Sequence, residues 1–151
     1  MLQTSKILAY PADFLKAIVA DVEQYPEFLP WIKAVAIYPK TPNFFEADLT
    51  FGHRLLEQTY RSEVFIHQDA VEAKAISDGM FKFLETRWHF LNHEDNRCLV
   101  NFTLDFQLQS RLLQLTVGKF LDEAASKMIA AFEVRAQKLW GQTNNGENDW
   151  P

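Results

Sequence analysis

Apolar residues recur every three to four positions along the C-terminal part of the chain, between Ser110 and Gly141. This spacing predicts one long amphipathic helix, because residues three and four apart share a face. Ser110 is placed to cap the first turn, and Gly141 is placed to end the helix. At about 1.5 Å per residue the helix is roughly 45 Å long, so it needs a broad apolar surface to cover. Its apolar face consists of Leu113, Val117, Phe120, Leu121, Ala124, Met128, Ala131, Phe132 and Leu139.

From Trp31 to Leu108 the pattern changes to an alternation of apolar and polar residues, which predicts β-strands with one buried face. Gly52 falls inside one of them and predicts a bulge or sharp bend, because a residue without Cβ weakens a strand. A further strand is expected at residues 4–10. The strands that follow are expected at 31–38, 45–51, 57–66, 70–77, 84–90 and 100–108, with turns at 39–43, 78–79 and 92–96.

Two short helices are predicted between the first strand and Trp31. Pro11 favours the first turn of the first helix. Pro26 and Pro30 limit the second to a short helical turn followed by a loop. The aromatic corner at residues 25–31 fits either a packed part of the core or an exposed apolar lid.

This order of elements predicts an α+β helix-grip fold, in which a curved antiparallel sheet of about six to seven strands wraps around the long C-terminal helix. Residues 1–141 are expected to form a single lipid-binding domain, and residues 142–151 a disordered tail. Such a sheet can leave a cavity under the helix, although the same side chains can also fill the space. The expected cavity lining is Phe28, Trp31, Phe45, Leu49, Phe51, Tyr60, Trp88, Phe102, Leu104, Phe106, Leu121 and Met128.

An exposed apolar edge is expected beside this cavity. Leu112 and Leu115 lie off the apolar face of the predicted helix, and with Tyr25 and Leu29 they are candidates for the place where a lipid enters or a membrane is touched. Arg135 interrupts the apolar face of the helix. It is expected to extend its charged end to the rim, to pair with a carboxylate such as Asp21, or to donate a hydrogen bond to a ligand.

Motifs for catalysis or metal binding are absent from the sequence. The four histidines are scattered, and no HExxH, CxxC, G-x-S-x-G or phosphate-binding glycine loop occurs. Cys98 falls on the same side of its predicted strand as the apolar residues, so we expect it to be a core residue. The net charge of -5 argues against DNA as a partner, because phosphate binding requires a basic face. We therefore expect a non-catalytic binding protein without a metal or catalytic cofactor.

The compartment is expected to be the cytoplasm, with peripheral contact to the inner membrane. A single cysteine fits a reducing environment. No apolar run reaches the roughly 18 residues that span a bilayer, and the N-terminus has no signal-peptide core.

Three blocks of the sequence resemble the coenzyme Q-binding family of the START, or polyketide cyclase-like, superfamily, whose bacterial members are often labelled RatA-type ribosome association toxins. The blocks are AYPADFLKAIVADVEQYPEFLPW, DGMFKFLETRWHF and LDFQLQSRLLQLTVGKFLDEAASKMIAAFEVRA, in that order. The resemblance implies a helix-grip (START/Bet v-like) fold that binds ubiquinone or a similar isoprenoid lipid in support of respiratory electron transport. For bacterial relatives it instead implies binding to the large ribosomal subunit and blocking of subunit association.

The residues that carry the resemblance are spread over all three blocks. Two positions depart from the family pattern: Met80 stands where a proline is common, and Thr86 replaces a common asparagine. The mitochondrial extension of eukaryotic members is absent, which indicates a bacterial protein. The matched residues are Tyr25, Pro26, Phe28, Leu29, Pro30, Trp31, Leu84, Trp88, Phe120, Asp122, Glu123, Ala124, Met128, Phe132 and Arg135.

Three functions follow from these observations, in this order of preference. The first is a non-catalytic quinone-binding chaperone, since an apolar cavity binds an isoprenoid without catalytic groups. The second is a ribosome association toxin. The third is a polyketide cyclase or dehydratase-like enzyme, which needs an acid and a base in the cavity.

Overall fold

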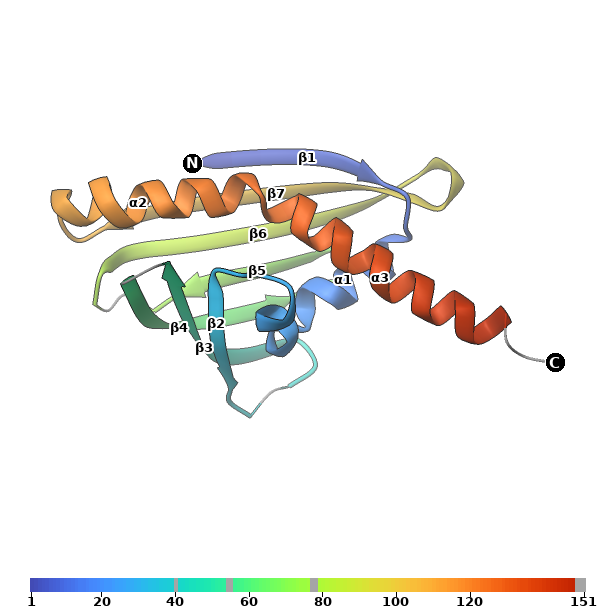
Figure 1. Ribbon diagram of the computed structural model, residues 1–151, viewed down its shortest axis with the longest axis horizontal. Helices are drawn as coiled ribbons and strands as arrows, with labels where there is room; N and C mark the ends of the chain where they lie inside the picture. Colours follow the sequence, from blue (N-terminus) through green and yellow to red (C-terminus); the bar gives the residue numbers. More distant parts are fainter. Residues whose placement is uncertain (40, 54–55, 77–78, 149–151) are drawn as a thin grey trace.

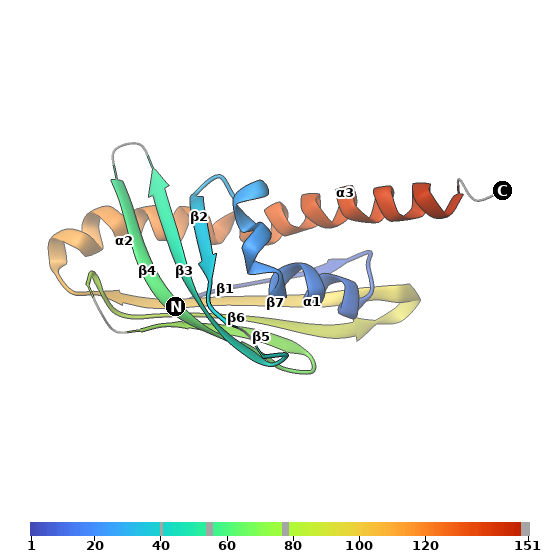
Figure 2. The ribbon, with the colours of Figure 1, turned by 90° about the horizontal axis from the view of Figure 1, so that it is seen from below.

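A single curved sheet forms the body of the protein, and the C-terminal helices lie across its concave face (Figures 1 and 2). The structure, a computed structural model, describes residues 1–39, 41–53, 56–76 and 79–148. Within these residues there are seven strands, all paired antiparallel, in the order β1-β7-β6-β5-β4-β3-β2. The predicted α+β architecture is confirmed. The strands are β1 (Leu2–Leu8), β2 (Ile32–Ile37), β3 (Phe44–His53), β4 (Leu56–Ile66), β5 (Ala70–Ala75), β6 (Phe81–His93) and β7 (Arg97–Leu108).

The sheet topology follows from short connections between consecutive strands. β2 to β7 form successive hairpins, and β1 pairs with β7, so the first and last strands lie side by side. The alternation predicted from sequence sets which residues face the helices. Trp88 of β6 lies opposite Phe102 of β7, and both side chains are buried. Their polar neighbours along the strands point to the convex face, as expected of a sheet with one wet side.

Four helical segments matter for the concave face: α1 (Ala12–Ala20), the 3-10 helix η1 (Val22–Glu27), α2 (Arg111–Ser126) and α3 (Met128–Asn148). A further 3-10 turn, η2 (Glu94–Asn96), joins β6 to β7. Pro11 is the N-cap of α1 rather than a residue of its first turn. Ser110 caps α2 as predicted, because its hydroxyl oxygen accepts a hydrogen bond from the backbone N–H of Leu113 at 3.1 Å.

The long C-terminal helix is confirmed, but the prediction that it is uninterrupted is wrong. It is divided at Lys127, where φ is −101° and ψ is 0°. The hydroxyl of Ser126 donates to the backbone carbonyl of Glu123 at 2.7 Å. A bond of this kind competes with the backbone ladder and bends helices. The two halves, α2 and α3, therefore meet at a junction in the middle of the sheet.

The predicted helix end at Gly141 is also wrong, since α3 continues to Asn148. Gly141 does not adopt the positive φ that ends helices. Trp140 also anchors this part of α3, because its ring packs against Phe14 at 5.0 Å. Residues 142–148 of the predicted disordered tail are helical, and residues 149–151 lie outside the described residues.

Gly52 does not form the predicted bulge. It pairs with Glu57 in the regular β3–β4 register, and its N–H donates to the carbonyl of Trp31 at 3.0 Å. The register shift lies in the neighbouring strand β2, between Ile32 and Ala34. Of the turn predicted at residues 78–79, the structure describes only Gly79, whose φ is +63°. Asp78 and the predicted strand end at Ser77 lie outside the described residues.

The aromatic corner at residues 25–31 is part of the core. Leu29 is only 1% exposed. The rings of Phe28 and Tyr25 pack against Phe132 of α3 at 4.9 and 5.4 Å. Phe132 also contacts Trp88 of the sheet, at 4.7 Å. Of the two interpretations that the sequence left open, the packed corner is correct.

Candidate ligand-binding cavity

An apolar space remains between the sheet and the α2–α3 junction. One cavity of about 100 Å³ lies against Trp88 and Phe102 of the sheet, and an adjoining cavity of about 80 Å³ lies under Leu121 of α2. They have five lining residues in common and form two parts of one interior space, called here the interior cavity. The shared residues are Trp31, Ile32, Tyr60, Thr86 and Met128.

The volume of the interior cavity limits what it can hold. Pockets for drug-sized ligands measure about 300–1,000 Å³. Most of the space between the sheet and the helices is therefore filled by the protein's own side chains. A ligand of that size must either displace side chains or extend out of the cavity through an opening.

One opening is lined by residues of β2 and of the α2–α3 junction. Figure 2 shows where these two elements lie. This hollow of about 400 Å³, called here the junction opening, shares Trp31, Phe120 and Ala124 with the interior cavity. Its remaining walls are Pro30, Lys33, Gly52, Glu123 and Lys127. The break in the C-terminal helix thus forms one side of the route from solvent to the interior.

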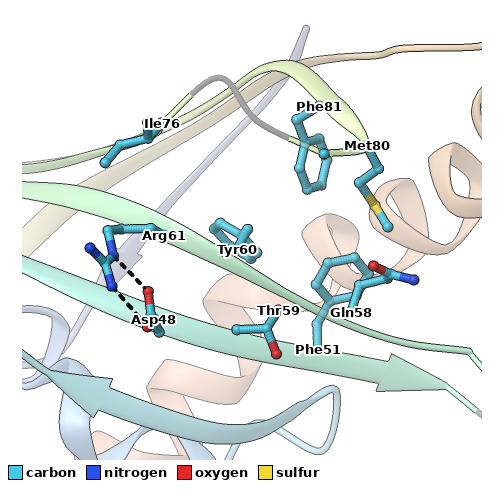
Figure 3. A pocket seen from close by; sticks show the side chains of 10 residues that line it. Asp48, Phe51, Gln58, Thr59, Tyr60, Arg61, Ile76, Met80 and Phe81 are labelled. Atoms are coloured by element: carbon cyan, nitrogen blue, oxygen red, sulfur yellow. Dashed lines mark hydrogen bonds and ion pairs between the residues drawn. The ribbon is translucent and has the colours of Figure 1, made fainter.

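A second opening, called here the sheet slot, lies where β4 separates from β5 (Figure 3). It measures about 440 Å³. The rings of Phe51, Tyr60 and Phe81 stand between it and the interior cavity, with Phe51 and Tyr60 lining both spaces. Aromatic side chains therefore close this route in the structure.

An ion pair forms one end of the sheet slot. The guanidinium of Arg61 binds the carboxylate of Asp48, with Nε 2.9 Å from Oδ1, and the hydroxyl of Tyr38 donates to the same carboxylate at 2.6 Å. The Arg61 hydrogen bond, followed by that of Tyr38, lowers the pKa of Asp48. Arg61 also stacks over the Tyr38 ring, 4.3 Å from its centroid. Both charges are thus partnered within the protein.

Besides the hydroxyl of Tyr25, which donates to the carbonyl of Val19, three hydroxyl groups give the interior cavity its polarity: those of Tyr60, Ser62 and Thr86. Ser62 is only 2% exposed. Burial raises the pKa of Tyr60 to about 12, so its phenol remains a proton donor at neutral pH. In the described part of the chain, none of the three hydroxyls has a hydrogen-bond partner. They are available to a polar group of a ligand.

Comparison with known proteins identifies the family. The family model described as polyketide cyclase / dehydrase and lipid transport matches residues 8–133. The chain belongs to this family. Its fold is that of a START superfamily protein from Mycobacterium smegmatis, with a TM-score of 0.78 at 20% identity, covering 91% of this chain and 97% of the other.

Two curated members of the family are similar over most of this chain. The ribosome association toxin RatA of Pseudomonas aeruginosa is 31% identical over 140 residues, which cover 93% of this chain and 97% of the relative. The mitochondrial coenzyme Q-binding protein COQ10 homolog B of Xenopus laevis is 30% identical over 144 residues, which cover 91% of this chain and 58% of that relative. The family resemblance stated from the sequence is therefore confirmed.

The structure brings most of the expected lining residues together around the interior cavity. Phe28 does not line it, because its ring packs against Tyr25 and Phe132. Phe45 is buried elsewhere in the core, and Phe106 lies against α2 near Gly118. The expected residues that do line the cavity are Trp31, Leu49, Phe51, Tyr60, Trp88, Phe102, Leu104, Leu121 and Met128.

Ser62 and Thr86 were not among the predicted site residues. The signal for both was present, because each is a small polar residue at an inward position of an alternating strand. The cavity also includes Val22, Ile32 and Phe132, which periodicity assigned to helices or strand ends without placing them near the site.

The predicted exposed edge does not exist as one surface. Leu29 is buried, and the hydroxyl of Tyr25 donates to the carbonyl of Val19, which ties η1 to α1. Burial raises the pKa of Tyr25. Leu112 and Leu115 are 71% and 68% exposed. Leu112 precedes Ala124, at the junction opening, by twelve residues along α2, which is roughly 18 Å.

Arg135 does not pair with Asp21 in the described part of the chain. Its guanidinium lies over the ring of Phe28, 5.2 Å from the centroid, and the residue is half-buried. This contact is a cation–π interaction, which places the charge on the outside of the aromatic corner rather than in the cavity.

Groups that could perform acid–base or metal chemistry do not converge on the cavity. Of its described lining residues, only Tyr25 and Tyr60 are ionisable. Cys98 is buried in the core, and burial raises the pKa of its thiol. In the ranges that the structure describes, no three His, Cys, Asp or Glu residues lie close enough to hold a metal ion. None of the described helices has the length and hydropathy needed to cross a membrane.

Proposed function

We propose that this protein associates with the ribosome and, by binding the large subunit, interferes with subunit joining. The observation that carries this proposal is the length of the match to RatA of Pseudomonas aeruginosa, which spans nearly the whole of both chains. The identity to the coenzyme Q-binding relative is similar, but only 58% of that protein is covered. Among the bacterial relatives, RatA of Rickettsia prowazekii is also matched over 96% of its length.

This proposal places the protein in the cytoplasm, where ribosomes are. The test is sedimentation of the purified protein through a sucrose gradient with isolated large or small ribosomal subunits. We expect the protein to migrate with the large subunit and to reduce the fraction of joined ribosomes when both subunits are mixed. A protein that stays at the top of the gradient with either subunit would falsify the proposal.

A second function is supported by the interior cavity: non-catalytic binding of a hydrophobic ligand of the isoprenoid or quinone type. The walls are apolar, and the free hydroxyls of Tyr60, Ser62 and Thr86 match a small polar group such as a quinone carbonyl. The family's description as lipid transport, and the coenzyme Q-binding relative, support the same ligand class. The lack of converging acids and bases in the described lining favours binding over the cyclase reaction.

Ligand binding is tested independently of the ribosome. We expect a short-tailed ubiquinone analogue to quench the fluorescence of Trp31 and Trp88 saturably, because both side chains line the cavity. Mass spectrometry of a solvent extract of the purified protein should show a co-purified apolar compound. Absence of both signals contradicts the ligand-binding function and leaves ribosome association untouched.

A further inference from the structure

The junction opening is continuous with the interior cavity but differs from it in charge. Trp31, Phe120 and Ala124 belong to both spaces. The interior lining that the structure describes contains no Lys, Arg, Asp or Glu, whereas the rim of the opening carries Lys33 and Lys127. A molecule that passes from the rim to the interior therefore moves from a charged to an apolar environment.

The two lysines face the opening from different elements. Lys33 lies on β2, and its Nζ donates to the carbonyl of Pro30 at 3.1 Å. Lys127 is the residue at which the C-terminal helix is divided. Both are exposed, and neither has an ion-pair partner in the described part of the chain. Glu123 is the only acidic residue among the described lining of the opening, so the local charge is positive on a chain whose net charge is -5.

The sizes of the two spaces determine which part of a ligand each space can hold. The interior cavity, in parts of about 100 and 80 Å³, accommodates the apolar end of a chain but not a bulky head. The junction opening of about 400 Å³ accommodates the rest. A polar head would then lie between Lys33 and Lys127, where an anion is favoured.

We propose that the junction opening holds the anionic head of a single-chain amphiphile whose apolar part enters the interior cavity. This inference rests on the proposal above that the interior cavity binds a hydrophobic ligand, and it names a ligand class other than a quinone: an apolar chain ending in a carboxylate or a phosphate. The polar group then lies at the junction opening rather than at the hydroxyls of Tyr60, Ser62 and Thr86. A fatty acid and a prenyl phosphate share this chemistry.

The test compares decanoate with decanol, its uncharged counterpart, by calorimetric titration at concentrations below micelle formation. The double variant Lys33→Gln/Lys127→Gln should weaken decanoate binding about fivefold to tenfold and change decanol binding less than twofold. The variant Glu123→Gln should strengthen decanoate binding about twofold, because it removes the carboxylate from the same rim. The matched control Lys119→Gln/Lys138→Gln removes two exposed charges outside the described lining of the opening and should leave both affinities within twofold.

The possible results distinguish failure of the proposed head-group site from failure of the cavity to bind a ligand. If decanol binds but the lysine variant leaves decanoate binding unchanged, the anionic head site is refuted and the cavity function stands. If neither compound binds, both are refuted. Geranyl phosphate in place of decanoate distinguishes the two sources when the loss in log affinity caused by the lysine variant is divided by the head-group charge. A larger loss per charge for the phosphate supports a prenyl phosphate, and an equal or smaller loss supports a fatty acid.

Discussion

The rings of Tyr60 and Phe81 lie 5.6 Å apart, centroid to centroid, at an interplanar angle of 70°, across the place where β4 leaves β5 (Figure 3). Phe51 completes the group at 5.9 Å from Tyr60 and 6.2 Å from Phe81. These edge-to-face and tilted contacts stabilise the sheet where its backbone pairing stops. They also separate the sheet slot from the interior cavity, so Tyr60 has both a structural and a ligand-facing role.

Tyr60 is expected to make stability fall at alkaline pH. Burial raises its pKa in the folded protein to about 12, above the value of about 10 for an exposed tyrosine. A raised folded-state pKa contributes stability that is complete below pH 10 and is lost as the pH rises through 12. In urea unfolding at a series of pH values, the free energy of unfolding should be level near pH 8 and decline above pH 10.

The substitution Tyr60→Phe should reduce this alkaline decline, since the phenol is removed and the ring contacts are kept. Tyr10→Phe is the control, because Tyr10 packs between Phe14 and Trp140 away from the cavity. It should keep the decline of the parent protein. An unchanged alkaline decline in Tyr60→Phe would show that Tyr60 does not contribute to it and would assign the decline to other tyrosines such as Tyr25, whose pKa burial also raises.

Trp88 is expected to be the side chain whose truncation costs most. It is buried and contacts Phe102 and Phe132, each at 4.7 Å, which joins the sheet to α3. Trp88→Ala should lower the free energy of unfolding by about 3–5 kcal/mol, measured by urea denaturation. Trp88→Phe keeps an aromatic ring and should cost less.

Ligand affinity provides a second test of the role of Trp88. If its ring forms the wall of a ligand site, the variant Trp88→Phe should lose affinity for a short-tailed ubiquinone analogue, while remaining folded. A variant that is less stable but retains full affinity would show that Trp88 is only a core residue.

The two serines at the start and end of α2 should differ on substitution by alanine. The hydroxyl oxygen of Ser110 accepts from the N–H of Leu113, so Ser110→Ala should cost about 1 kcal/mol as a lost N-cap. The hydroxyl of Ser126 donates to the carbonyl of Glu123 within the last turn. Ser126→Ala should be neutral or slightly stabilising, because that bond competes with the helix. Equal losses in chemical denaturation would contradict this assignment.

The sequence predicted the elements and the faces of the strands, because both depend on local periodicity. Trp88 and Phe102 were assigned inward from the alternation of their strands and are buried opposite each other. The helix junction could not be found in the same way. Ala124, Met128 and Phe132 follow the 3.6-residue period across the junction, so the apolar pattern shows no break there. The local feature that accompanies the break is the hydrogen bond of the Ser126 hydroxyl to the backbone, which periodicity does not reveal.

The limits of the cavity could not be predicted for a related reason. Phe45, Leu49 and Phe51 share one face of β3, yet Leu49 and Phe51 line the interior cavity and Phe45 does not. Alternation specifies the face of a strand but not the position along it at which packing leaves a space. That position depends on side-chain volumes contributed by η1, α2 and α3.

Ribosome association is expected to depend only weakly on salt. A protein that binds through many rRNA phosphates loses affinity steeply as salt rises, because each neutralised phosphate releases a counterion. Here Arg61 is paired with Asp48, and Arg87 with Glu72, on the convex face of the sheet. These arginines are not free to neutralise phosphates, and the net charge is -5.

The affinity for large subunits, measured by co-sedimentation from about 50 to 200 mM salt, should therefore fall with a log–log slope shallower than about −3. Asp48→Asn frees Arg61 from its partner and should make the slope steeper if the convex face contacts rRNA. Glu133→Gln is the control, because Glu133 pairs with Lys6 between β1 and α3, away from that face. A slope of about −6 or steeper in the parent protein would mean extensive phosphate contact and would place the ribosome-binding surface on residues other than these paired arginines.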